Sequence, residues 1–326
     1  MGRDTGVTPS LGLNRRAARI AEGLAADADV FGIHATTLAN GTRVLDCGVE
    51  QTGGLDAGRL LAEVCMGGAG RVAFVPWTLE GISLPGVTVV TDHPAEACLA
   101  SQYAGWAIHP EGYFAMGSGP LRAIARVETE LYRKLDYAEP ADGPGVLVLE
   151  TSILPEESVA EWVAGRSGVP TDRLILLAAR TASLAGGVQI SARVVETALH
   201  KLAHLGFDVH RVVSGFGSAP VPPVAKNDLR AIGRTNDCVL YGGSVQLHVR
   251  AEDDELSALA ARLPSSASRD YGLPFYDLFQ RYDRDFYKVD PELFSPAEVS
   301  LTSVTSGRTF TAGSKNPDVL RRSLLG

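Results

Sequence analysis

The stretch GVLVLETSILPEESVAEWVAGRSGVPTDRLILLAAR, residues 145–180, decides the fold class. Residues 145–150 and 173–180 are short apolar runs, which is typical of buried strands. Between them, residues 156–165 have a helical pattern. The order strand, helix, strand indicates an α/β protein in which some strands pair in parallel. We therefore predict an α/β fold (α+β mixed sheets).

The segment just before this stretch, residues 139–145, is rich in Pro, Gly and Asp. Such a composition marks a linker, so we predict an N-terminal α/β domain over residues 1–143 and a C-terminal one over residues 144–326. Glycine pairs at 53–54 and 186–187 each precede an amphipathic helix that follows a strand. This shared pattern indicates two related domains.

Turn signals and periodicity predict further elements upstream of the linker. Asn40-Gly41 lies between two strand-like runs and predicts a hairpin. The other expectations are helices over residues 11–27, 57–65, 94–106 and 121–135, and strands over residues 71–76, 87–91 and 113–116.

Composition and charge limit the classes of function. The chain has 326 residues, of which 45% are hydrophobic and 21% are charged, as in ordinary globular enzymes. The formal net charge of −8 argues against general nucleic-acid binding, which requires a basic surface. A few Lys and Arg side chains can still build a basic pocket for an anionic ligand.

Cysteines, histidines and apolar segments predict a cytoplasmic protein without a metal. The four cysteines are widely spaced, which indicates buried reduced thiols rather than a zinc site. His200 and His204 lie four residues apart but lack the acid of a metalloprotease motif. The N-terminus lacks the basic and apolar parts of a signal peptide, and no apolar run approaches the roughly 20 residues that span a bilayer. We expect no metal, no membrane contact and a cytoplasmic location.

Residues 188–205 form the most periodic helical segment of the chain, and Gly206 follows as a stop signal. On a helical wheel, apolar residues cover one broad face of this segment. The opposite side carries a narrow polar stripe, which consists of Gln189, Arg193, Glu196 and His200.

Two interpretations of this polar stripe stay open. In the first, the stripe faces solvent, and Arg193 and Glu196 form a surface pair worth about 0.3–0.5 kcal/mol. In the second, the pair lies at the floor of a pocket, where Glu196 takes a proton from water and Arg193 orients the water or the substrate. In such a pocket Arg193 lowers the pKa of Glu196 while burial raises it.

The segment Gly117-Ser118-Gly119-Pro120 lies between an expected strand and an expected helix. One interpretation is an anion site, because a loop at a helix N-terminus exposes backbone N–H groups. The other is a tight turn in which Pro120 starts the helix. Ser118 and Gly119 are the candidate binding residues of this segment.

Residues 214–243 combine Gly, Pro and polar types, followed by an apolar run that we expect to be a strand over residues 239–241. They form either a surface loop or a loop that builds a site, and we favour the second. Four side chains are the candidates: Lys226 and Arg234 for an anionic group, and Asn236 and Asp237 for a polar ring.

Five runs of the sequence resemble one family. They are ACLASQYAGWAI (97–108), YFAMGSGPLRA (113–123), QISARVVETALHKL (189–202), GRTNDCVLYGG (233–243) and DFYKVDPELFSPAEV (285–299). Their order and spacing are similar to those of the methenyltetrahydromethanopterin cyclohydrolases. Because five separate runs agree, the resemblance is more specific than any single motif above.

The resemblance implies a hydrolase that acts on a C–N bond of a cyclic amidine. The implied substrate is 5,10-methenyltetrahydromethanopterin or its dephospho form, and the product is the N5-formyl compound. Water adds to the electrophilic methenyl carbon, so no nicotinamide, metal or other prosthetic group is implied. The implied catalytic residues are Glu196, as base towards water and acid towards N10, and Arg193, which positions Glu196 and the water.

The resemblance also implies two α/β domains with the pterin in a cleft between them, and a homotrimer. The implied cleft residues are the loop of residues 117–120, Gln189 and residues 214–237. The composition, heavy in Ala, Gly, Arg and Val, suggests one-carbon metabolism in bacterial formaldehyde oxidation rather than in a methanogen. Two alternatives stay open: a phosphate-handling transferase that uses residues 117–120 and Lys226, and a non-catalytic pterin-binding protein.

Overall fold

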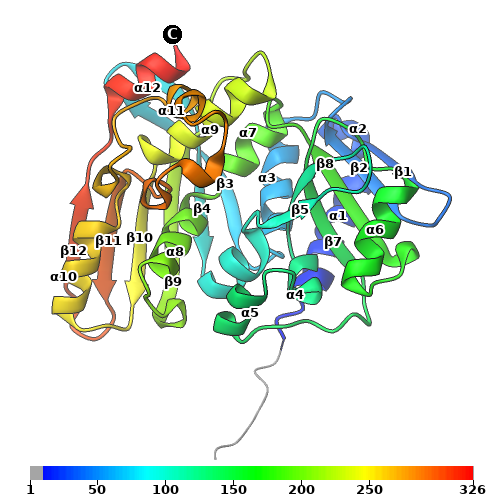
Figure 1. The fold of residues 1–326 in the computed structure, drawn as a ribbon, viewed down its shortest axis with the longest axis horizontal. Coiled ribbons are helices and arrows are strands. Elements are labelled where there is room, and N and C mark those ends of the chain that lie inside the picture. The colour runs from blue at the N-terminus through cyan, green and yellow to red at the C-terminus, as the bar shows by residue number, and fades with distance from the viewer. Residues whose placement is uncertain (1–9, 326) are drawn as a thin grey trace, which may run out of the picture.

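A computed structural model describes residues 10–325 of the chain. Residues 1–9, part of the segment in which no signal peptide is expected, lie outside the described residues. Within the described residues the strands form two mixed six-stranded sheets, A and B, flanked by helices (Figure 1). The predicted α/β fold with mixed sheets is confirmed. None of the helices in residues 10–325 combines the length and the apolar composition needed to cross a membrane.

The helices vary from single turns to fourteen residues. The longer ones are α1 (Leu13–Ala26), α3 (Leu55–Cys65), α6 (Glu157–Ser167), α7 (Leu184–Ser191), α8 (Val194–His204), α9 (Asp228–Leu240), α10 (Asp253–Arg262), α12 (Pro317–Leu324) and the π-helix η1 (Ala95–Gln102). The shorter ones are α2 (Ala28–Phe31), α4 (Leu121–Ala125), α5 (Thr129–Leu135), α11 (Phe275–Arg281), η2 (Thr171–Arg173), η3 (Val209–Arg211), η4 (Ser265–Ala267), η5 (Phe286–Lys288) and η6 (Pro291–Leu293).

Sheet A has the strand order β1-β2-β8-β7-β6-β5. Its strands are β1 (His34–Thr37), β2 (Arg43–Gly48), β5 (Trp106–Ile108), β6 (Ala115–Ser118), β7 (Gly145–Glu150) and β8 (Leu174–Ala179). The pairs β2·β8 and β8·β7 are parallel, and the outer pairs are antiparallel. Residues 145–180 therefore form the strand–helix–strand crossover that their sequence predicts, with α6 as the connecting helix.

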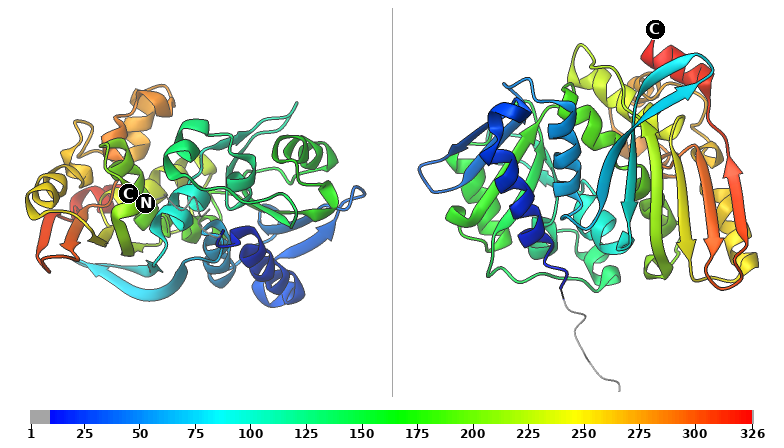
Figure 2. Two further views of the ribbon diagram at one scale, coloured as in Figure 1. Left: turned by 90° about the horizontal axis from the view of Figure 1, so that it is seen from below. Right: turned by 180° about the vertical axis from the view of Figure 1, so that it is seen from behind.

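Alternation along β7 shows why sheet A has helices on both faces. Val146 and Val148 pack with residues of α1 and α3, while Leu147 and Leu149 pack with residues of α4 and α6. Figure 2 shows α1 and α3 on the side of the sheet opposite α6. Because both faces of the strand are covered, its sequence is a continuous apolar run rather than an alternating one.

Sheet B has the strand order β12-β11-β10-β9-β4-β3. Its strands are β3 (Arg71–Leu79), β4 (Ile82–Thr91), β9 (Val212–Pro220), β10 (Ser244–Val249), β11 (Glu298–Ser303) and β12 (Thr309–Gly313). Only β10·β11 is parallel among these pairs. Helices α8 and α10 pack on one face of sheet B. The opposite face of the sheet is turned towards the viewer in the rear view of Figure 2.

The largest apolar core contains residues of η1, α8 and sheet B. Helix α3 packs on α1 and β7 of the sheet A side, and also on η1 and β3. Helix α8 packs on η1, β9 and β10. The junction of α3, η1 and α8 therefore lies where the two halves of the molecule meet.

The two sheets share the sequence in an interleaved way. Sheet A takes β1, β2, β5 and β6 from before residue 143 and β7 and β8 from after it, while sheet B takes β3 and β4 from before it and the rest from after it. The chain therefore passes between the sheets several times. The domain boundary at residues 143 and 144, which falls in a loop, stays a prediction, and so does the kinship of two domains.

Three expectations about the C-terminal half are wrong. Residues 214–243 do not form one long loop, since most of them belong to β9 and α9. Residues 239–241 lie at the end of α9 and just beyond it, instead of in a strand. The helix expected over residues 188–205 is interrupted, because α7 begins earlier and ends at Ser191.

In the N-terminal half, the hairpin at Asn40-Gly41 is confirmed as β1–β2, and Gly41 has a φ of 89° that favours glycine. The helix expected over residues 121–135 is wrong in extent, because α4 and α5 are separate. Arg126 ends α4 in a left-handed conformation, with a φ of 49°.

Candidate active site

The break between α7 and α8 places the candidate catalytic residues. Ser183 caps α7 by accepting the N–H of Gly186 at 2.9 Å. At the other end, the amide Nε2 of Gln102 donates to the carbonyl of Ala192 at 3.1 Å. A side chain bonded into the helical ladder is a known cause of a helix break. Arg193 consequently occupies the N-cap position of α8.

Arg193 is a buried guanidinium with three polar neighbours. Its Nη1 donates to the carbonyl oxygen of Gln102 at 2.7 Å, and its Nη2 donates to Oε1 of Gln189 at 3.3 Å. The same Nη1 lies 4.0 Å from Oε2 of Glu196. Because Gln189, Arg193 and Glu196 are all buried, the interpretation of the stripe as a solvent-exposed face is wrong.

Glu196 is only 4% exposed and lies in the first turn of α8. Burial raises the pKa of its carboxyl to about 7, although the positive charges of Arg193 and Arg122 act in the opposite direction. The N-terminal end of the helix also favours the ionised form. A carboxyl with a pKa near 7 exists in both protonation states at neutral pH, so it can both accept and donate a proton.

Ser118 and Gly119 lie against the end of η1. The hydroxyl of Ser118 donates to the carbonyl of Gln102 at 2.6 Å, and the N–H of Gly119 donates to the carbonyl of Ser101 at 2.8 Å. Gly119 has a φ of 112°, which explains the glycine at this position. This N–H is therefore used within the protein rather than left open for an anion, which disfavours the transferase alternative.

The four candidates around α9 lie apart from the Arg193–Glu196 pair. Lys226 is exposed just before the helix. Arg234 donates to the carbonyl of Pro223 at 3.3 Å, and the side-chain amide of Asn236 donates to the carbonyl of Ile232 within α9. In residues 10–325, no hydrogen bond or ion pair joins any of the four to Arg193 or Glu196.

The fourth candidate, Asp237, is fully buried and faces α11. Its Oδ1 accepts the N–H of Phe275 at 2.8 Å, at the first residue of that helix. Its neighbours Cys238 and Tyr241 belong to an apolar cluster with α11 and α12. Burial raises the pKa of Asp237 to about 8, against the lowering effect of hydrogen bonds from Ser323 and from the Phe275 N–H.

Two residues of the site were not singled out from the sequence. Gln102 is buried and contacts both Ala192 and Arg193, and Arg122 is fully buried beside the end of η1. Both lie inside runs quoted above only for their family resemblance, namely residues 97–108 and 113–123. A polar residue inside a mostly apolar run was the available signal.

A cavity of about 420 Å³ opens beside this site. Its lining residues are Tyr103, Val127, Glu128, Thr129, Glu130, Leu131 and His200. The rings of Tyr103 and His200 stack with centroids 4.9 Å apart. Burial, and to a smaller extent His204, lowers the pKa of His200, which favours the neutral imidazole. The fourth residue of the polar stripe, His200, thus lies at the wall of this cavity, four residues after Glu196 on α8.

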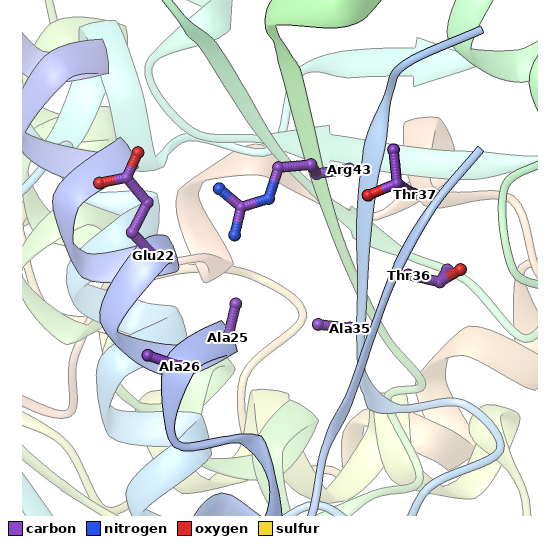
Figure 3. A pocket seen from close by; sticks show the side chains of 7 residues that line it. All are labelled: Glu22, Ala25, Ala26, Ala35, Thr36, Thr37 and Arg43. Carbon is purple, nitrogen blue, oxygen red and sulfur yellow. The ribbon is translucent and has the colours of Figure 1, made fainter. Parts of the chain in front are cut away.

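A second cavity, of about 350 Å³, lies between α1 and the β1–β2 hairpin (Figure 3). Glu22 and Arg43 face it from opposite sides, and the remaining lining residues are alanines and threonines. It belongs to the outer part of sheet A, and none of the candidate residues lines it.

A buried carboxyl with a raised pKa beside a guanidinium is an arrangement that enzymes with acid–base catalysis use. The chain belongs to the cyclohydrolase (MCH) family, whose model matches residues 12–324. The expected family is thereby confirmed.

Relatives in bacteria and archaea extend over nearly the whole chain, and each is named methenyltetrahydromethanopterin cyclohydrolase. The protein of Xanthobacter autotrophicus is 46% identical over 325 residues, which cover 98% of this chain and 94% of the relative. That of Methylobacterium organophilum is 44% identical, covering 95% and 97%. That of Methanocaldococcus jannaschii is 43% identical, covering 96% and 98%.

Proposed function

We propose that this protein hydrolyses 5,10-methenyltetrahydromethanopterin, or its dephospho form, to the N5-formyl compound in one-carbon metabolism. The names of relatives that match almost the full chain support this substrate. The observation that carries the chemistry is the buried Glu196 carboxyl, with a pKa of about 7, beside Arg193. The hydrolysis needs one group that takes a proton and later returns it, and Glu196 has the properties for both.

The reaction follows from the charge of the substrate. The methenyl carbon belongs to an amidinium cation, so it is attacked by water once a base removes one proton. Glu196 takes that proton, and a carbinol carbon forms between N5 and N10. N10 then takes the proton back from Glu196 as the C–N10 bond breaks. The hydroxyl proton leaves as the formyl C=O forms, so one proton is released per turnover.

Arg193 has a positioning part in this scheme. Its guanidinium is held by the Gln102 carbonyl and the Gln189 amide, which leaves it aligned beside Glu196. We propose that it orients Glu196 and the attacking water. Positioned bases of this kind contribute about 10²- to 10⁴-fold in rate.

We propose that Ser118, Gly119 and Gln189 line the pterin site, because they contact the same end of η1 or Arg193 itself. Binding by Lys226, Arg234 and Asn236 stays a prediction, and it requires the pterin to extend towards α9. For Asp237, whose contacts lie with α11, we propose a structural role instead.

We further propose that the reaction needs no prosthetic group or metal, because the substrate is already an electrophile. By family resemblance we propose a cytoplasmic homotrimer that acts in formaldehyde oxidation, with no nucleic-acid or membrane partner. Light scattering after size-exclusion chromatography measures the oligomeric state, and a mass near three chains is the expected result.

The direct experiment follows the absorbance of the methenyl chromophore in a weakly catalytic buffer. Protein treated with a chelator should accelerate the loss of the chromophore well above the buffer rate. Absence of acceleration by well-folded protein would overturn the proposed reaction. Binding of the pterin without turnover would favour the non-catalytic alternative.

A further inference from the structure

The carbonyl end of the π-helix η1 is an unusual feature of the site. The last carbonyls of any helix lack partners within that helix, and a buried end needs other donors. π-helical turns are rare and often occur at functional sites. Here the four carbonyls of residues 99–102 all accept hydrogen bonds, and the donors come from Gly119, Ser118, Arg122, Tyr132 and Arg193.

Arg122 contributes the most contacts to this end. Its Nη1 donates to the carbonyls of Leu99 and Ser101, both at 3.1 Å. Its Nε donates to Oε1 of Glu128 at 2.9 Å, and its Nη2 lies 2.8 Å from the same oxygen. The guanidinium carbon also lies 5.1 Å from the centre of the Tyr103 ring. The side chain of Arg122 is 0% exposed, so protein atoms surround it completely.

Gln102, the last residue of η1, connects these contacts to the catalytic pair. Arg122 donates to the Ser101 carbonyl, which belongs to the peptide bond between Ser101 and Gln102. The carbonyl of Gln102 itself accepts a hydrogen bond from Arg193. Its side chain holds the Ala192 carbonyl at the break before α8. The backbone of η1 at residues 101 and 102 thus sets where Arg193 and the first turn of α8 lie.

We propose that Arg122 is a positioning residue for the Arg193–Glu196 pair, acting through the carbonyl end of η1, and that Glu128 holds Arg122 in place. This role rests on the proposed hydrolysis. Arg122 does not touch the substrate in this scheme. It keeps Gln102 at the place where the Gln102 carbonyl and amide can hold Arg193 and Ala192.

The planar fork of arginine suits this position better than a lysine ammonium. Two backbone carbonyls, one carboxylate and the rings of Tyr103 and Tyr132 surround the guanidinium in fixed directions. A lysine retains the charge but cannot reproduce these directions together. The positive charge of Arg122 also acts to lower the pKa of Glu196, against the larger effect of burial.

Arg211 offers a control with similar partners, although its side chain is 34% exposed while that of Arg122 is buried. Its guanidinium also bonds one carbonyl, that of Arg250 at 2.7 Å, and one carboxylate, that of Glu255 at 2.9 and 2.6 Å. It also lies over an aromatic ring, that of Phe207, at 4.8 Å. Arg211 lies before β9 and on the opposite end of α8 from Glu196, so its contacts serve a different part of the fold.

The experiment measures kcat and KM for hydrolysis of the methenyl pterin by wild type, R122K, E128Q and R211K. Binding sites are counted by equilibrium titration with the N5-formyl product, and kcat is referred to those sites. We expect R122K to lose about 10- to 100-fold in kcat while KM changes by less than about threefold, because small displacements of catalytic groups cost this much. E128Q should lose about 3- to 10-fold, since the amide oxygen can keep both contacts with Arg122 but the negative charge that strengthens them is gone. R211K should stay within about twofold of wild type.

The outcomes separate the two proposals. If wild type does not accelerate hydrolysis, the proposed function fails and the positioning role fails with it. If wild type is active and R122K keeps its kcat per binding site, only the positioning role is overturned. If kcat of R122K is lower per total protein but equal to wild type per binding site, the positioning role is also overturned. Such a result would show that Arg122 only maintains the folded protein. A loss of the same size in R211K would also overturn it.

Discussion

Glu196 and Asp237 are two buried acids with raised pKa values, about 7 and about 8, yet their surroundings differ. Glu196 lies at the positive end of α8, 4.0 Å from the guanidinium of Arg193, and the charge of Arg122 also acts on it. Asp237 lies in α9 among aliphatic and aromatic side chains, where it accepts the first N–H of α11.

The difference shows that a buried carboxyl marks a catalytic site only through its neighbours. Cations held beside Glu196 can stabilise negative charge as it forms. At the break between α7 and α8, just before Glu196, Gln102 of η1 donates to the Ala192 carbonyl. Asp237 instead lies beside the N-terminal end of α11, where the N–H of Phe275 needs a hydrogen-bond acceptor. Both residues were sequence candidates, and we propose a chemical role for Glu196 and a structural one for Asp237.

The largest effect that separates the two acids is on turnover. We expect E196Q to lose about 10²- to 10⁴-fold in kcat, because the amide cannot take a proton from water. D237N should stay within about threefold of wild type, because the asparagine oxygen still accepts the Phe275 N–H. Steady-state kinetics with the methenyl pterin measure both. Equal losses in the two variants would remove the distinction.

Arg193 sharpens the comparison, because no hydrogen bond or ion pair within residues 10–325 joins Asp237 to an arginine. R193K keeps the charge but loses the two-pronged contact with the Gln102 carbonyl and the Gln189 amide. We expect a fall in kcat of about 10- to 100-fold. R262K is the control, since Arg262 forms only an exposed pair with Glu292, and it should match wild type.

Stability should show what the two acids have in common. A carboxyl whose pKa is higher in the folded than in the unfolded chain binds its proton more tightly when folded, so stability falls as pH rises between the two values. For Glu196 this window runs from about pH 4.5 to about 7. E196Q should therefore be more stable than wild type by about 3 kcal/mol at pH 8 and by less at pH 5.

D237N should gain stability in the same direction, over a window that extends from about pH 3.8 to about 8. Thermal unfolding followed by circular dichroism at pH 5 and pH 8 measures both variants. A wild-type protein that is more stable than E196Q at pH 8 would show that Glu196 is ionised without cost. The burial argument for its proton exchange would then be wrong.

The sequence predicts the fold where local patterns decide it. Residues 145–180 fold as expected because a parallel strand buried on both faces needs an apolar run and a crossover helix. The density of Gly and Pro in residues 214–243 misled the prediction of a loop, because glycines of β9 such as Gly217 lie against Val194 and Val195. Asn227, which caps α9 by accepting the N–H of Arg230, was a usable helix signal.

The site was only partly predictable for a related reason. Spacing placed Arg193 near Glu196, because residues three apart share a helical face. It could not reveal burial, or the break at Ala192, since both depend on Gln102, which is 90 residues away in the chain. The role of Arg122 depends on packing against η1 in the same way.

The pH dependence of kcat tests the central role of Glu196 most directly. Three groups act electrostatically with its carboxyl: Arg193, Arg122 and the Cys98 thiol, whose pKa is raised chiefly by burial. Because the ionised carboxylate is the base, we expect kcat to rise with pH through an apparent pKa near 7 and to level off above it. Below that value kcat should fall about tenfold per pH unit. A kcat that stays flat from pH 5.5 to 8.5 in folded wild-type protein would contradict the assignment of Glu196 as the base.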